Sequence, residues 1–232
     1  MTRYDRAPHP FVLSVGLGRR ERAENDSDLI FGLRLFGKAC KAAPFILRAF
    51  EEAGARGLGG QRVPFRLEQI ELEDVAEAHW LPGQSYPEPA ERDPPTALSK
   101  HVKLIFLTPL RLMSNGRLCS PDNFDASAMA MALVRRVGLI NTFFGDRESS
   151  MDFSTLKTEA KAIITLSRSL RWRKLSRYSN RQKARQSIGG LIGTVELDLS
   201  QTPQMRQILA WAPIVHIGKG TSMGLGRVEL AP

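Results

Sequence analysis

Residues His216–Leu230 read HIGKGTSMGLGRVEL. Glycine-rich loops occur in several fold classes, and the element that follows the loop distinguishes between them. From Gly218 to Gly226, four of nine residues are glycine. A loop that binds a nucleotide in an α/β fold opens a helix, whereas this loop leads into LGRVEL, Leu225–Leu230, which is typical of a strand. The stretch therefore favours an α+β fold.

The known nucleotide-binding motifs do not fit this loop. A phosphate loop needs G-x-x-x-x-G-K-[ST], but Pro213 stands where the first glycine belongs and Gly220 follows Lys219. The G-x-G-x-x-G fingerprint fails too. Gly218 and Gly220 have the right spacing, but three residues instead of two separate Gly220 from Gly224. One interpretation is a tight turn. The other is a contact with a nucleic-acid backbone through the loop amides, Lys219, Thr221 and Ser222.

The positive charge of the chain is concentrated in one segment. The 232 residues carry 33 Lys and Arg against 24 Asp and Glu, a net charge of +9. Between Ala160 and Val195 there is no acidic residue, and the nine basic residues there account for the whole excess. A solvated basic face is one interpretation, but solvated faces usually carry both positive and negative charges. We therefore favour a surface that binds a polyanion.

The composition is that of a globular protein, with 42% hydrophobic and 25% charged residues. The N-terminus lacks an apolar signal segment, and Arg135 and Arg136 interrupt the most apolar stretch, so we expect a cytoplasmic protein without membrane partners. Two cysteines, Cys40 and Cys119, are too few for a zinc site, and we expect them to be reduced and structural. No metal or other cofactor is expected.

The first half of the sequence predicts one helix and several strands. The strands, or a hairpin, are expected at 11–17 and 28–37, and a third strand at 63–74. A helix is expected over 38–56, with Pro44 in its first turn or kinking it, and with the glycines from Gly57 ending it. The proline-rich segment 82–95 predicts a linker or a long surface loop.

The second half predicts the same types of element. A strand is expected over 101–113, followed by a turn at 114–117, and helices over 124–144, with Asp122 or Asn123 as cap, and 153–169, capped by Asp152. The basic segment predicts two β arms, 170–179 and 188–197, and a helix at 203–211 precedes the last strand. These patterns predict two α+β units, residues 1–98 and 99–232, with a single larger α+β domain as the alternative.

Four motifs in order resemble a known family. They are LRLFGKACKAAPFILRAFEEAGARGLG (33–59), FLTPLRL (106–112), RYSNRQKARQSIGGLIGTVEL (177–197) and the closing glycine loop. Together they resemble the CRISPR-associated endoribonucleases of the RAMP superfamily, which process precursor crRNA. The resemblance implies two tandem ferredoxin-like (RRM-like) domains with the glycine-rich loop between them.

The resemblance also implies a reaction. Members of the family bind the CRISPR repeat RNA, often as a stem-loop, and cleave the RNA at the 3′ base of the stem. The cleavage needs no metal: the ribose 2′-OH attacks the adjacent phosphate and leaves a 2′,3′-cyclic phosphate. Many members place a general-base His near the first helix, but this sequence has none between His9 and His79. Basic residues occupy the matching place, so the catalytic candidates are Arg34, Lys38 and Lys41. The alternative interpretation of Lys38 and Lys41 is that they are ordinary exposed lysines at the start of a helix. His101 is a weaker candidate base.

The RNA-binding candidates lie in the basic segment and the glycine loop. They are Arg168, Arg171, Arg173, Lys174, Arg177, Arg181, Lys183, Arg185, Gly218, Lys219, Gly220, Thr221, Ser222 and Arg227. Trp172 and Tyr178 alternate with the arginines and are expected to face the core rather than RNA, and His216 is expected to be a core or helix-end histidine. The predicted function is a crRNA-processing endoribonuclease that stays bound to the crRNA. The alternatives are a non-catalytic crRNA-binding subunit of a CRISPR effector complex and a general RNA- or ribosome-associated protein.

Overall fold

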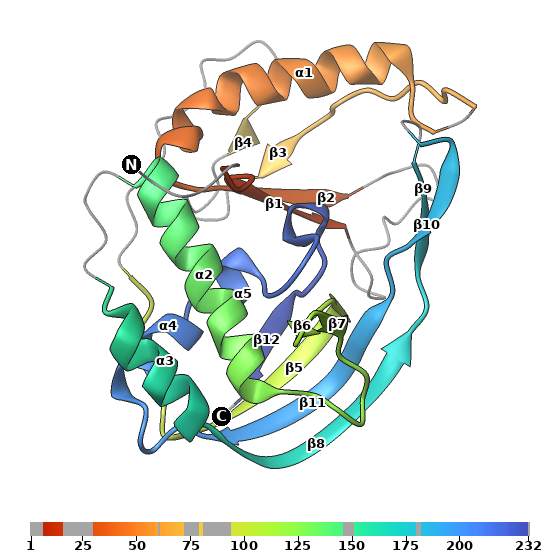
Figure 1. Ribbon diagram of the computed structural model, residues 1–232. Helices are drawn as coiled ribbons and strands as arrows, with labels where there is room; N and C mark the ends of the chain where they lie inside the picture. The colour runs from red at the N-terminus through yellow and green to blue at the C-terminus, as the bar shows by residue number, and fades with distance from the viewer. Residues whose placement is uncertain are drawn as a thin grey trace.

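A four-stranded antiparallel sheet forms the base of the second half in the computed structural model (Figure 1). The structure describes residues 7–15, 30–59, 61–71, 79–80, 94–145, 151–179 and 182–231. The strand order is β12-β5-β11-β8, with all three neighbouring pairs antiparallel. The strands are β5 (His101–Leu110), β8 (Ile164–Arg173), β11 (Gly190–Asp198) and β12 (Val228–Ala231).

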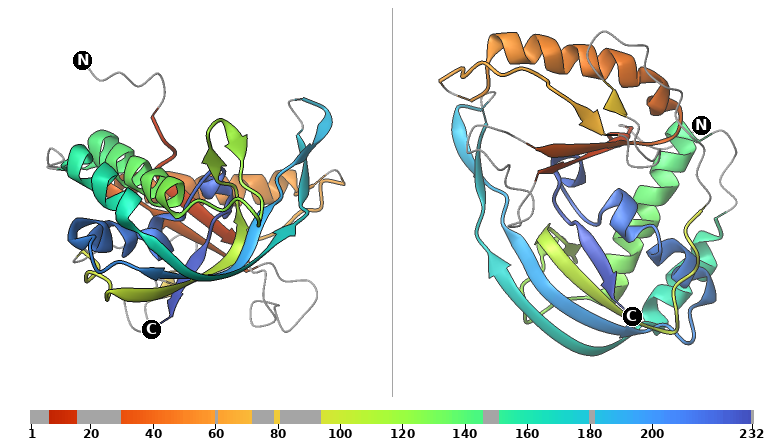
Figure 2. Two further views of the ribbon diagram at one scale, coloured as in Figure 1. Left: turned by 60° about the horizontal axis from the view of Figure 1, so that its bottom comes forward. Right: turned by 180° about the vertical axis from the view of Figure 1, so that it is seen from behind.

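The order of helices and strands identifies the fold of this half. Along the chain a strand is followed by helices, two strands, two short helices and a last strand, and in the sheet the fourth strand lies beside the first. This is the βαββαβ pattern of a ferredoxin-like unit. The helices, which lie on one face of the sheet (Figures 1 and 2), are α2 (Ala126–Phe144), α3 (Phe153–Ala162), α4 (Pro203–Leu209) and α5 (Ala212–Val215).

The core lies between that helix layer and the sheet. Alternate residues of β5, including Leu104 and Phe106, are buried, and they meet Met129 and Leu133 of α2, both fully buried. This alternation is what a sheet with one covered face requires. The opposite face of the sheet carries polar residues such as Lys103 and Glu196, whose side chains form an ion pair at 3.1 Å.

The described residues of the first half form two small antiparallel pairs and one long helix. β1 (Phe11–Val15) pairs with β2 (Phe31–Leu35), and β3 (Ile70–Glu71) pairs with β4 (His79–Trp80). A 3-10 helix, η2 (Gly37–Ala42), leads into α1 (Ala43–Arg56). As predicted, Pro44 lies in the first turn of α1, and Gly57 caps its end with a φ of 79°.

Several predicted boundaries were wrong. The cap of α2 is Asp125, whose carboxylate accepts from the Ala128 amide at 2.9 Å, while Asn123 accepts from the Ser120 amide instead. The helix predicted to continue to residue 169 ends at Ala162, because residues 164–173 pair along β11. The turn at 114–117 is confirmed and joins β6 (Met113–Ser114) to β7 (Arg117–Leu118).

The strand predicted over 63–74 is reduced to Ile70–Glu71 within the described residues, since Val63 makes only an isolated bridge to Leu58. Most of the predicted linker, 82–93, lies outside the described residues, and the boundary between 1–98 and 99–232 stays a prediction. Cys40 and Cys119 are free thiols. None of the helices described is long and apolar enough to cross a membrane.

Candidate nucleic-acid interface

The acid-free segment forms the edge strand β8 and a hairpin that extends from the sheet (Figures 1 and 2). The hairpin strands are β9 (Ser176–Ser179) and β10 (Ala184–Ser187), which continue β8 and β11 past the helix layer toward the C-terminal end of α1. The predicted RNA-binding residues that are exposed here are Lys174, Arg177, Lys183 and Arg185. Arg181 lies outside the described residues.

The arginines of β8 differ in their surroundings. Arg168 donates to the carbonyls of Asp122 at 2.9 Å and Phe124 at 3.4 Å, so its guanidinium ties β8 to the segment before α2. Arg171 is exposed, whereas Arg173 is half-buried. Arg168 is exposed as well, but those carbonyls engage its guanidinium, so Arg171 is the better candidate on β8 for contact with a polyanion.

Of the two aromatic residues in the basic segment, Tyr178 faces solvent, contrary to the sequence prediction, whereas Trp172 lies on the core face of the sheet beside its buried cross-strand partner Leu191. Tyr178 is 60% exposed and Trp172 is 38% exposed. The prediction was wrong for Tyr178 because the helices α2 to α5 cover the four-stranded sheet and do not extend over β9 and β10, while Trp172, on the edge strand β8, is only partly covered (Figures 1 and 2). An exposed Tyr beside Arg185, its cross-strand partner, is suited to stacking on nucleobases.

A pocket of about 500 Å³ lies where the hairpin meets the glycine loop. Its lining residues come from three distant parts of the chain: Arg111, then Gln186, Ser187 and Ile188, then Lys219, Gly220, Met223 and Leu225. The predicted residues Lys219 and Gly220 thus meet the base of the predicted hairpin. The volume is in the range of small-ligand sites.

Arg111 is a site residue that the sequence prediction missed. Its Nη1 donates to the carbonyls of Gly189 at 2.9 Å and Ser187 at 3.2 Å, and its own carbonyl accepts from the Lys219 amide at 3.0 Å. It therefore joins the hairpin base to the glycine loop. The sequence feature that could have indicated Arg111 is its position in PLRL, directly after the long, largely buried strand β5.

The glycines of the loop approach the protein's own backbone. A Cβ added at Gly226 would lie 1.8 Å from the Ile217 carbonyl oxygen, and one added at Gly224 would lie 2.5 Å from that of Leu13. Both residues have positive φ, 69° and 82°. Tight packing, one of the two interpretations of this cluster, therefore explains these two glycines.

The loop offers fewer groups to a phosphate than the sequence suggested. The amides of Lys219 and Met223 already donate to carbonyls, and Thr221 is only 5% exposed, so its hydroxyl is closed to a ligand in this structure. Gly218, Gly220 and Ser222 are half-buried, and Lys219 is exposed. Arg227 is half-buried, with its amide donating to the Thr108 hydroxyl at 2.8 Å.

His216 lies buried beside three arginines where the two halves meet. It is 3% exposed, follows the end of α5, and its Nδ1 has no hydrogen-bond partner among the described residues. Burial and, to a smaller extent, the positive charges of Arg136, Arg227 and Arg34 together lower its pKa to about 4. As predicted, His216 is a core and helix-end residue, but one ring nitrogen is unsatisfied.

The arginines beside His216 also hold the end of α5. Arg136 donates through Nε to the Val215 carbonyl, and burial lowers its pKa to about 10. The catalytic candidate Arg34, on β2, donates through Nη1 to the Pro213 carbonyl at 3.5 Å. Cations near the last carbonyls of a helix stabilise it, so both guanidiniums have a structural role here.

The other catalytic candidates, Lys38 and Lys41, are exposed on η2. This segment packs against the end of α2, where a Cβ on Gly37 would lie 2.1 Å from the Phe144 carbonyl. Lys38 and Lys41 precede the N-terminal end of α1, whereas the hairpin β9–β10 extends toward its C-terminal end (Figure 1). The structure does not bring these two groups of predicted residues together.

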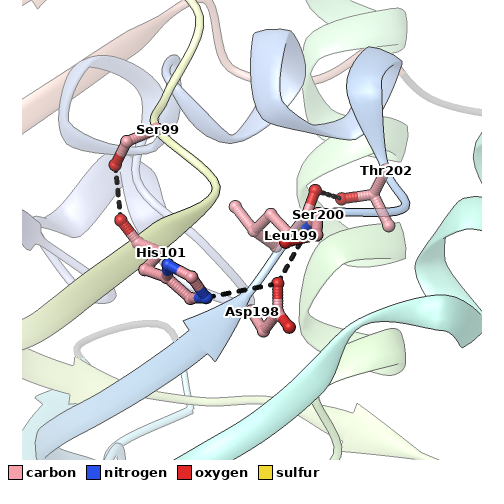
Figure 3. A network of polar contacts seen from close by, with 6 residues as sticks. All are labelled: Ser99, His101, Asp198, Leu199, Ser200 and Thr202. Atoms are coloured by element: carbon pink, nitrogen blue, oxygen red, sulfur yellow. Dashed lines mark hydrogen bonds and ion pairs between the residues drawn. The ribbon is translucent and has the colours of Figure 1, made fainter.

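His101 lies at the other end of the sheet. Its Nε2 is 3.7 Å from the Asp198 carboxylate, and the Asp198 carboxylate also accepts from the Ser200 amide at 2.8 Å (Figure 3). His101 begins β5, while Arg111 follows its end, and nine strand residues span about 30 Å. This histidine is therefore remote from the pocket and the hairpin.

The sequence matches known family profiles along most of its length. The profile of the CRISPR-associated endoribonuclease Cas6 family matches residues 104–228, more than half of the chain. A second profile, described as an N-terminal domain, matches residues 1–90. Curated protein sequences give no match.

Solved Cas6 structures are similar over nearly the whole chain. A product complex of a Thermus thermophilus Cas6 has a TM-score of 0.62 and 20% identity, covering 96% of this chain and 82% of that one. The product complex of a different Cas6 has a TM-score of 0.57 and 18% identity, covering 98% and 84%. Likeness at these identities shows the fold, and the predicted α+β class with tandem ferredoxin-like domains is confirmed.

Proposed function

The chain belongs to the CRISPR-associated endoribonuclease Cas6 family, and from this premise we propose that it binds the stem-loop of a CRISPR repeat RNA and cleaves it at the 3′ base of the stem. The observation that carries the proposal is the exposed, acid-free hairpin β9–β10, which meets the glycine loop at a pocket that contains Arg111 and Lys219. Such a surface suits an RNA backbone, because duplex RNA is recognised through its shape and phosphates. The protein then stays bound to the mature crRNA through these contacts.

The proposed reaction needs no metal. The ribose 2′-OH attacks the adjacent phosphate, the bond to the 5′-oxygen breaks, and the products are a 2′,3′-cyclic phosphate and a 5′-OH. The charge of the phosphorane is stabilised by cations, for which we propose Lys38 and Lys41 on η2 and Arg34 on β2. With no histidine between His9 and His79, electrostatic stabilisation and strained RNA geometry provide the acceleration.

The test is cleavage of repeat RNA from the array of the same genome by purified protein in EDTA, followed on a denaturing gel. We expect cleavage at one site, blocked by a 2′-deoxy substitution at the nucleotide that attacks. Lys41→Ala should reduce the single-turnover rate about 100-fold, as removal of one oxyanion-stabilising group does elsewhere. Lys157→Ala, an exposed lysine on α3, is the control and should cleave normally.

The second candidate function is a non-catalytic crRNA-binding subunit of a CRISPR effector complex. The missing histidine in the first half favours it. Intact RNA at stoichiometric protein, together with tight binding of the same RNA, would overturn the nuclease proposal and support this one.

A further inference from the structure

The pocket between the hairpin and the glycine loop combines cations with apolar surface. Arg111 and Lys219 provide the positive charge, and no acidic residue is among the described residues that line it. The guanidinium of Arg111 is fixed by two carbonyls, and the backbone of Lys219 is fixed by the Arg111 carbonyl. The guanidinium of Arg111 is therefore held in place before a ligand arrives, while the exposed side chain of Lys219 extends from a fixed backbone position.

The apolar lining consists of Ile188, Met223 and Leu225. Met223 is 41% exposed, and its thioether sulfur lies 3.1 Å from Nη1 of Arg177 on β9. Arg177 is itself positioned by Gln186, whose Oε1 accepts from its Nη2 at 3.0 Å. This contact places a third cation at the rim, on the hairpin side of the thioether.

A ligand matching this lining has an anionic group and a flat apolar face. A methionine sulfur makes favourable contacts with aromatic rings, and fixed cations bind phosphate. Paired bases inside a stem have both faces covered by their neighbours, so only an unstacked base could use the apolar lining. RNA-binding proteins commonly accept such splayed-out bases in pockets.

We propose that this pocket binds one unstacked nucleotide of the RNA that flanks the stem, with its base against Met223 and Ile188 and its phosphate between Lys219 and Arg111. The inference rests on the proposed function, since the nucleotide belongs to the repeat RNA. It adds a single-strand requirement to binding, which shape recognition of the stem alone would not give.

The experiment compares two uncleavable, 2′-deoxy-substituted RNA hairpins with the same stem, one blunt and one with a single unpaired nucleotide at the 5′ or the 3′ end. Fluorescence anisotropy with the full chain gives the Kd of each. The unpaired nucleotide should tighten binding at least about fivefold, the lower end of a base-stacking contribution. Met223→Ala should remove most of this gain. The Kd of the blunt hairpin, measured with the same variant, reports any separate loosening of β9–β10 through the lost contact with Arg177, and it should change less than the gain does.

Leu118→Ala is the matched control, because Leu118 on β7 is 37% exposed and lies outside the pocket. It should keep the full gain. Equal binding of the two hairpins by the unchanged protein, or an undiminished gain in Met223→Ala, would overturn the inference while leaving the proposed function standing. Failure to bind either hairpin would overturn both.

A third arm titrates adenosine and uridine 5′-monophosphate. Mononucleotide binding that depends on Met223, without a gain from the unpaired nucleotide, would assign the pocket to a free nucleotide and overturn its role in RNA recognition. Competition of the mononucleotide with the unpaired end of the RNA would support the proposal.

Discussion

At the residue scale, His216 is the most constrained side chain of the junction. It is buried, has a φ of 60° and a ψ of 165°, a region that residues other than glycine rarely adopt, and is surrounded by the charges of Arg34, Arg136 and Arg227. Strain of this kind persists only where the surrounding structure enforces it. The neutral imidazole is the form that this environment accepts.

This environment predicts that His216 makes the protein sensitive to acid. Its pKa is about 4 in the folded state against about 6.5 when unfolded, so between these values the unfolded chain binds the extra proton. Lowering the pH from 7 toward 4 should therefore cost up to about 3 kcal/mol of stability through this group. Urea unfolding at about pH 7 and about pH 4.5 measures the loss.

His216→Asn removes the titrating group, and Asn tolerates positive φ better than most residues. Its stability should depend less on pH than that of the unchanged protein over this range. His101→Asn, at an exposed histidine, is the control and should retain the full dependence. Equal acid sensitivity in all three proteins would contradict the prediction.

At the element scale, the hairpin β9–β10 carries cations on both faces. Arg177 and Gln186 share one face, and Arg185 and Tyr178 share the other, because directly paired residues of antiparallel strands point the same way. An isolated two-stranded hairpin is only marginally stable in water. Its contacts with Met223 of the loop help to hold it near the pocket.

We predict that these cations determine the salt dependence of RNA binding. Replacing Arg177, Lys183 and Arg185 by Gln should weaken binding and reduce the slope of log K against log salt by about 2 to 3, because each phosphate that a cation neutralises adds close to one unit to that slope. Titrations at several salt concentrations give the slope. A control with Arg66, Arg117 and Lys157 replaced by Gln has the same net charge, and an equal slope change there would refute the prediction.

At the scale of the whole molecule, the glycine loop packs the two halves together. The loop and its 3-10 helix, η3 (Thr221–Met223), lie between the β1–β2 hairpin and the four-stranded sheet (Figure 1). The Thr108 hydroxyl donates to the Gly224 carbonyl at 2.7 Å from the sheet side, while Leu13 of β1 approaches Gly224 from the other side. The loop is therefore a structural contact between the halves as well as one wall of the pocket.

This packing predicts that Gly224→Ala separates the halves or unfolds the protein. The added methyl group would lie 2.5 Å from the Leu13 carbonyl, and we expect a loss of stability of more than about 3 kcal/mol. Gly116→Ala is a matched control, since Gly116 has a φ of 77° and open space at its Cβ position. Equal melting temperatures of the two variants would show that positive φ alone matters.

Local sequence patterns suffice to predict many of the helices and strands and the basic surface. The strand β5, the capped helix α3 and the β1–β2 hairpin follow from local periodicity and capping residues, and the acid-free segment is visible from charge alone. Local patterns failed where a neighbour decides the outcome. Residues 164–169 look helical but pair with β11, and Tyr178 looks core-facing but is 60% exposed on a hairpin that α2 to α5 do not cover (Figure 1).

Which distant residues come into contact depends on the tertiary structure. The fold brings Arg111, the hairpin base and Lys219 around one pocket, and it gathers Arg34 and Arg136 beside His216. It leaves Lys38 and Lys41 at the N-terminal end of α1, away from the hairpin. These neighbours are separated by dozens of residues along the chain, so no local pattern encodes their distances. Their proximity results from strand register and from glycines that let distant backbones come into contact.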